Sequence, residues 1–159
     1  MTASVGFTRA WNTAHPSSFR VELLHQEAPT NRQTQTQQPS PSRSGVPAAG
    51  VHLILDLFSA THLADMEVVE TTLRRCVDAA GATLLHIHLH RFEPNDGISG
   101  VAVLAESHIS IHTWPEAEYA ALDIFMCGQA RPERCIEILL EAFKPQRAVM
   151  EQILRGRAS

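Results

Sequence analysis

The sequence predicts an α+β fold, a two-layer sandwich in which an antiparallel sheet carries two helices on one face. Three observations lead to this prediction. Short apolar segments alternate with period two or run continuously, as strands do, and two longer segments repeat apolar residues at helical spacing. The elements follow in the order β-α-β-β-β-α-β, and consecutive strands favour an antiparallel sheet. Its second face would need cover, for which a second copy of the chain is one candidate.

Turn residues and helix-end residues mark where the predicted elements stop. The first helix is expected over residues 64–80, because its apolar face ends before Gly81. The second is expected over residues 132–143, since a proline stands in its first turn. Residues 93–100, EPNDGISG, have the composition of a turn. Strands are expected at 51–58, 82–92, 101–106, 107–114, 119–126 and 147–154.

The chain is expected to form one domain preceded by an extension. Residues 28–50 are rich in Gln, Thr, Pro and Ser, and they bury too little apolar surface to offset the entropy of ordering them. We therefore predict that residues 1–50 are a disordered or weakly ordered N-terminal extension. Residues 51–159 are predicted to be the folded domain, of about the commonest domain size.

Composition narrows the classes of partner. The 159 residues carry a formal net charge of −4, which gives no general attraction for nucleic acid. No apolar run approaches the roughly 20 residues of a membrane-spanning helix, so no membrane partner is expected. The three cysteines lack C-x-x-C spacing, which favours a reducing cytoplasm over a secreted disulfide scaffold. A small molecule or a protein is the expected partner.

Lys144 is the only lysine in the chain, since the other basic residues are all arginine. Enzymes that use pyridoxal phosphate attach it to a lysine as a Schiff base. That role would fall here to one residue at the predicted end of a helix.

His86, His88 and His90 alternate along one predicted strand and therefore project from the same face. His-x-His pairs on strands bind zinc. Three histidines in line reach one ion less readily than ligands from different elements, and no fourth ligand is evident. We predict no metal site and interpret the row as a polar or interfacial sheet face; a zinc-dependent protein remains an alternative.

Residues 105–116, AESHISIHTWPE, place reactive side chains inside a predicted strand. The pattern differs from the Gly-x-Ser-x-Gly turn that exposes the serine of a hydrolase. A serine hydroxyl can also attack the carbonyl that precedes it, which turns the amide between Glu106 and Ser107 into an ester. Elimination from that ester and hydrolysis of the dehydroalanine leave a pyruvoyl group, a reactive ketone made without a lysine. An ordinary strand serine is the plain alternative for Ser107.

Residues 97–128, GISGVAVLAESHISIHTWPEAEYAALDIFMCG, resemble the prokaryotic pyruvoyl-dependent S-adenosylmethionine decarboxylase proenzymes. The resemblance extends upstream through HRFEP and GATLL to GVHLILDLF, and less specifically downstream to the RG near the end. Residues 1–49 lie outside it. The resemblance implies cleavage between Glu106 and Ser107 into a β chain and an α chain. Ser107 would become the pyruvoyl group, the covalent cofactor that forms a Schiff base with the substrate.

Five further residues receive roles from the resemblance by position. Ser99 is expected to steady the ester during processing, and His112 to act as the proton acceptor. Cys127 is expected to be the proton donor after carbon dioxide leaves, since free thiols are mostly protonated at neutral pH. Phe92 and Glu116 are expected to bind the adenine and the ribose hydroxyls of the substrate. Structural roles, such as packing of Cys127 as a small hydrophobe, are the alternatives.

The function implied by the resemblance is decarboxylation of S-adenosylmethionine, which supplies the aminopropyl donor for spermidine biosynthesis. Such proteins pair as homodimers of processed protomers with the site at the interface. Alternatives are a decarboxylase of ornithine or arginine on the same scaffold, and a partner subunit that does not process itself. Phe92 and Glu116 favour S-adenosylmethionine. Two features depart from the family pattern: the turn at 93–100 is one residue longer, and Met126 stands where threonine is common.

Overall fold

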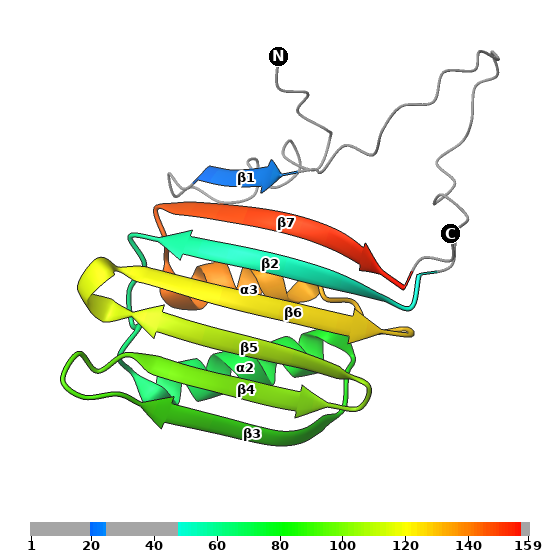
Figure 1. Ribbon diagram of the computed structural model, residues 1–159, viewed down its shortest axis with the longest axis horizontal. Helices are drawn as coiled ribbons and strands as arrows, with labels where there is room; N and C mark the ends of the chain where they lie inside the picture. The colour runs from blue at the N-terminus through cyan, green and yellow to red at the C-terminus, as the bar shows by residue number, and fades with distance from the viewer. Residues whose placement is uncertain (1–19, 25–47, 157–159) are drawn as a thin grey trace, which may run out of the picture.

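The computed structural model of the protein describes residues 20–24 and 48–156, which form one sheet and two helices (Figure 1). The helices are α2 (Met66–Ala80) and α3 (Arg134–Phe143). The strands are β1 (Arg20–Leu24), β2 (Gly50–Phe58), β3 (Leu84–Arg91), β4 (Ile98–Leu104), β5 (Ser107–Trp114), β6 (Tyr119–Cys127) and β7 (Arg147–Arg155). A 3-10 turn, η1 (Pro115–Ala117), joins β5 and β6.

The strands form one sheet in the order β1-β7-β2-β6-β5-β4-β3. All neighbours from β7 to β3 are antiparallel, and both helices lie on one side, behind the sheet as Figure 1 shows it. The predicted α+β class, the two helices and the six predicted strands are confirmed. Four strands follow one another between the helices, as the predicted ranges imply and one more than the order β-α-β-β-β-α-β writes. Strand β1, inside the predicted extension, pairs in parallel with β7 at the edge. The rest of that extension up to residue 47 lies outside the described residues.

Helix α2 starts and stops where its end residues dictate. The Asp65 carboxylate accepts hydrogen bonds from the backbone N–H groups of Glu67 and Val68, so the helix starts at Met66 rather than at residue 64. Gly81 ends it with a φ of 72°, a left-handed conformation that glycine adopts without a Cβ clash. Helix α3 begins at Arg134 rather than at residue 132, because Pro132 lies in the turn just before it, where its carbonyl accepts a hydrogen bond from the Cys135 N–H.

The hydrophobic core fills the space between the sheet and the helices. Each central strand sends alternate residues into it, and α2 and α3 close it from the other side. The largest fully buried side chains are Leu53, Leu55, Leu57, Leu73, Ile98, Ile109, Ile111, Leu122, Ile124, Met126, Leu139 and Phe143. This packing fixes which residues of every strand point away from the helices.

The opposite face of the sheet is polar and aromatic, and no helix of the described residues covers it. His86, His88 and His90 are exposed on strand β3. Within residues 20–24 and 48–156, no three or more His, Cys, Asp or Glu side chains are grouped to hold a metal ion. None of the described helices is long and apolar enough to cross a membrane.

Candidate active site

The proposed cleavage point lies in the tight hairpin turn between β4 and β5. Leu104 pairs with Ser107, so only Ala105 and Glu106 form the turn. Glu106 has a φ of 61°, the left-handed region that residues with a Cβ occupy at a cost. The peptide bond that joins this residue to Ser107 is the one expected to break. Local strain therefore lies next to the expected scissile bond.

Ser107 is the first residue of β5, and a hydrogen bond fixes the position of its side chain. It is 8% exposed, and its Oγ accepts a hydrogen bond of 3.1 Å from the backbone N–H of Cys127. Strand β6 ends at Cys127, at the end of the sheet where β5 begins (Figure 1). The structure therefore brings together the expected pyruvoyl precursor and the expected proton donor.

Ser99 and His112 form a second pair at the other end of the same strands. They are directly opposite each other in the β4–β5 ladder, and a hydrogen bond of 2.8 Å joins Ser99 Oγ to His112 Nδ1. Both side chains lie on the face away from the helices. The two residues expected to assist processing are therefore neighbours in space.

The two pairs are far from each other within one chain. Ser107 and His112 are five residues apart on an extended strand, which separates them by about 17 Å at the usual rise per residue. Because side chains alternate, the Ser107 side chain faces the helices and the His112 side chain faces away. A proton acceptor acts within hydrogen-bond reach, roughly 3 Å, so His112 of one chain cannot serve its own Ser107 in this arrangement.

Phe92 and Glu116 lie at the same end of the sheet as His112. Phe92 follows β3, is 50% exposed and contacts the His90 ring edge to face, with 4.6 Å between the ring centres. Glu116 lies in η1, directly after β5, where its carboxylate accepts a hydrogen bond from Asn95. An exposed aromatic ring and an exposed carboxylate, the two groups expected to bind the nucleoside, are therefore both accessible there.

A row of aromatic rings crosses the open face beside His112. Trp114 stacks on Tyr119 at 5.2 Å, and Tyr119 contacts Phe58 at 5.3 Å. The Arg147 guanidinium lies 3.8 Å above the Phe58 ring, a cation–π contact. Burial, together with the hydrogen bond that the Tyr119 hydroxyl donates to Asp56, raises the pKa of Tyr119 to about 12. Sequence analysis did not single out this row, although strand alternation places all of its members on one face.

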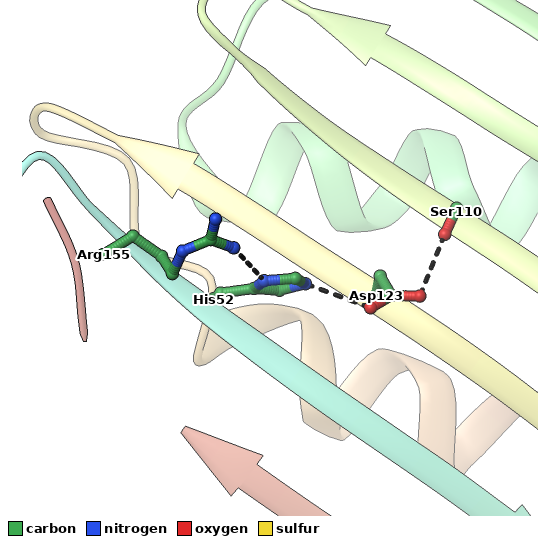
Figure 2. A network of polar contacts seen from close by, with 4 residues as sticks. All are labelled: His52, Ser110, Asp123 and Arg155. Atoms are coloured by element: carbon green, nitrogen blue, oxygen red, sulfur yellow. Dashed lines mark hydrogen bonds and ion pairs between the residues drawn. The ribbon is translucent and has the colours of Figure 1, made fainter. Parts of the chain in front are cut away.

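A polar network occupies the open face nearer the Ser107 end (Figure 2). His52 Nε2 is 3.0 Å from Asp123 Oδ1, and Ser110 Oγ donates to Asp123 Oδ2 at 3.3 Å. Arg155 Nη1 donates to His52 Nδ1 at 3.2 Å. Four strands contribute one residue each, which no single segment of the sequence could have indicated.

Cys76 and Cys135 lie away from this face, between the two helices. Both are fully buried, and each thiol donates to the main-chain carbonyl of the other residue. The hydrogen bond with Cys135 and burial raise the pKa of Cys76 well above its ordinary value. Because Cys76 and Cys135 are both buried, the partly exposed Cys127 is the cysteine available for chemistry.

Comparisons with known proteins identify the family of this chain. The S-adenosylmethionine decarboxylase family model matches residues 51–156. An S-adenosylmethionine decarboxylase proenzyme of Thermomicrobium roseum is 44% identical over 108 residues, 67% of this chain and 93% of the relative. One from Prochlorococcus marinus is 52% identical over 93 residues, 57% of this chain and 74% of the relative.

An archaeal relative and a solved structure are also similar to this chain. The proenzyme of Methanococcus maripaludis is 46% identical over 110 residues, 67% of this chain and 89% of the relative. The crystal structure of the adenosylmethionine decarboxylase from Aquifex aeolicus superposes with a TM-score of 0.62 at 31% identity, covering 70% of this chain and 94% of that one. The family expected from the sequence is thereby confirmed: this chain belongs to the S-adenosylmethionine decarboxylases.

Proposed function

We propose that this chain is a proenzyme that cuts itself between Glu106 and Ser107 and then decarboxylates S-adenosylmethionine. The product would be the aminopropyl donor for spermidine biosynthesis, made in the reducing cytoplasm that the cysteine usage favours. One observation carries the proposal. The Ser107 hydroxyl is buried next to a left-handed residue and oriented by the Cys127 N–H, so a nucleophile is fixed beside a strained peptide bond.

Self-cleavage uses residues of the protein and one molecule of water. The Ser107 oxygen bonds to the Glu106 carbonyl carbon as the Ser107 nitrogen leaves, which gives an ester. Ser99 donates a hydrogen bond that steadies this ester, and His112 removes the proton on the Ser107 α-carbon. Elimination releases the Glu106 carboxylate and leaves dehydroalanine, which water converts to the pyruvoyl group with loss of ammonia. The cut frees Ser107 from the hairpin turn.

The pyruvoyl group, once formed, supplies the carbonyl that condenses with the substrate amine and accepts the electrons released by decarboxylation. The residues present fit this group better than a lysine-bound cofactor, because Lys144 is exposed at the end of α3. The Cys127 thiol returns a proton to the substrate carbon. Phe92 offers a ring face to the adenine, and Glu116 accepts hydrogen bonds from the ribose hydroxyls.

The active unit is a homodimer in which each site combines both copies. His112 lies about 17 Å along the strand from its own Ser107, so the processing pair of one copy acts on the Ser107 of the other. The open sheet face provides the surface for such a pairing. Val103 and Trp114 on it are 40% and 41% exposed, so apolar side chains are available there for contact with a partner.

Intact mass spectrometry of purified protein tests the self-cleavage. The wild type should consist of two chains, residues 1–106 and 107–159, the second beginning with a pyruvoyl group. Ser107→Ala should stay in one piece. Ser110→Ala, on the same strand but facing away from the helices, is the matched control and should still be cut. A wild-type protein that stays uncut contradicts the proposal.

A carbon dioxide release assay tests the substrate. S-adenosylmethionine, ornithine and arginine are offered in parallel to the cleaved protein, with Ser107→Ala as the blank. Release from S-adenosylmethionine alone is the expected result. Release from ornithine or arginine instead would assign the chain to a different decarboxylase on the same scaffold.

Complementation tests the shared site. Ser107→Ala and His112→Ala are produced in the same cells with different affinity tags. In mixed dimers the His112→Ala chain keeps its Ser107 and receives an intact His112 from its partner, so it should be cut. Produced alone, it should stay intact. Persistent failure in purified mixed dimers would show that the two residues act within one chain.

A further inference from the structure

The turn between β3 and β4 is closed by its backbone and anchored to β3. The Phe92 N–H donates to the Gly97 carbonyl at 2.8 Å, so residues 93–96 form a compact loop. Arg91 Nη1 lies 3.8 Å from Asp96 Oδ1, and Asp96 has a φ of 55°, a conformation that Asp tolerates better than most residues. The loop is thereby held close to the end of β3, where Phe92 follows.

The same turn also reaches across to η1. Asn95 Nδ2 donates a hydrogen bond of 3.2 Å to Glu116 Oε1, which joins residues 21 positions apart in the sequence. Asn95 lies in the turn that the sequence resemblance indicates to be one residue longer than the family pattern. The contact links this turn to the carboxylate expected to bind the ribose.

The contact suits a carboxylate that accepts hydrogen bonds from the two ribose hydroxyls of a substrate. An exposed glutamate loses up to about 2 kcal/mol of side-chain freedom when it is fixed on binding. The Asn95 amide restrains Glu116 beforehand through one oxygen and leaves Oε2 open to accept from the substrate. A group that is ordered in advance binds more tightly than one ordered by the ligand.

We propose that Asn95 is a positioning residue that sets the affinity for the nucleoside part of the substrate by orienting Glu116. The inference rests on the proposed function, in which Glu116 accepts hydrogen bonds from the ribose hydroxyls. Asn95 acts on binding, before chemistry, so its contribution belongs to the substrate KM and not to kcat. Within one chain, Asn95 lies at the opposite end of the sheet from residues 106 and 107 and bonds to Glu116 rather than to Ser99 or His112, so Asn95 variants should still be cut.

Steady-state kinetics of the cleaved enzyme tests the role. Asn95→Ala should raise the KM for S-adenosylmethionine about three- to tenfold, as expected for the loss of one hydrogen bond, with kcat unchanged. Asn95→Asp should raise it further, since it places a second negative charge beside Glu116. Asp96→Asn is the matched control on the same turn. It removes only an exposed ion pair and should leave KM within about twofold.

A double-mutant cycle separates positioning from a general effect on the turn. The ligand is 5′-methylthioadenosine, which carries the nucleoside without the reacting group, and its dissociation constant is measured by calorimetry. In the Glu116→Ala background, Asn95→Ala should change that dissociation constant by less than about twofold, because the carboxylate that Asn95 orients is absent. An equal effect in both backgrounds, or none in the wild-type background, overturns the inference. Absence of carbon dioxide release by the wild type would instead overturn the proposed function.

Discussion

At Cys127 the backbone N–H orients Ser107, while the thiol is proposed to donate a proton to the substrate. A substitution of the side chain can distinguish these two roles. The hydrogen bond that orients Ser107 comes from the Cys127 N–H, which every residue except proline retains. Cys127→Ala should therefore still be cut into two chains, while decarboxylation falls by at least about a hundredfold through loss of a general acid. Electrophoresis and carbon dioxide release measure the two steps. A variant that folds but stays uncut would show that the thiol itself takes part in processing.

Tyr119 is the only tyrosine in the chain, so its ionisation can be followed without interference. Burial and the contact with Asp56 raise its pKa to about 12, against about 10 for a free tyrosine. Its contribution to stability is then complete below about pH 10 and is lost as the pH rises toward 12, because the unfolded chain ionises first.

Ultraviolet absorbance of tyrosinate measures this directly. The native protein should titrate near pH 12, and Asp56→Asn should lower the midpoint because the negative neighbour is removed. Tyr119→Phe, the control, should show no tyrosinate at all. A native midpoint near 10 would mean that the open face is more solvated than the contacts between Tyr119, Asp56 and the neighbouring rings indicate.

At the scale of elements, Thr113 joins β5 to two other parts of the fold. Its buried hydroxyl accepts from the Ile98 N–H and donates to the Leu63 carbonyl, both at 2.8 Å. Thr113→Val keeps the shape of the side chain but leaves the Ile98 N–H and the Leu63 carbonyl without this partner. The free energy of unfolding should therefore fall by about 1–3 kcal/mol. Thr113→Ser keeps the hydroxyl and should lose less. Urea denaturation compares them, and equal stability of Thr113→Val and wild type would contradict the role.

Elements were predictable from the sequence where local patterns decide them. The period-two alternation of β5 and β6 and the turn residues around α2 predict strand, helix and fold class because burial on one face is a local constraint. The same alternation already implies that Ser107 and His112 face opposite sides, since their positions differ by five, an odd number.

The sequence could not predict contacts that depend on tertiary packing. Asn95 meets Glu116, and Thr113 meets Leu63, only after β3, β4 and β5 have paired in their final register. Strand β1 shows the same limit. Its pairing with β7 depends on a free sheet edge more than a hundred residues away in the sequence, and the composition around it favours a tail.

At the scale of the whole molecule, the position of β1 makes a prediction about the extension. Among the described residues, β1 contributes a parallel edge pairing with β7 and the 4.0 Å contact between Glu22 and Arg147. A variant lacking residues 1–47 should therefore still fold and be cut, with a melting temperature close to that of the full chain. Removal of residues 1–58 also deletes β2 and should abolish folding. If the variant lacking residues 1–47 were unfolded and uncut, the extension would be required for folding.

Strand β2 lies between β7 and β6, and all nine of its residues pair on both sides. A cut after Glu106 would assign β2 to the first polypeptide and both of its neighbours to the second. Strands of the two products would thus alternate in the sheet. Neither product could dissociate unless the hydrogen bonds of β2 with β6 and β7 were broken. Cleavage at the proposed bond would therefore break the chain and leave the sheet intact, so the new chain end at residue 107 could move while the residues around it stay in place.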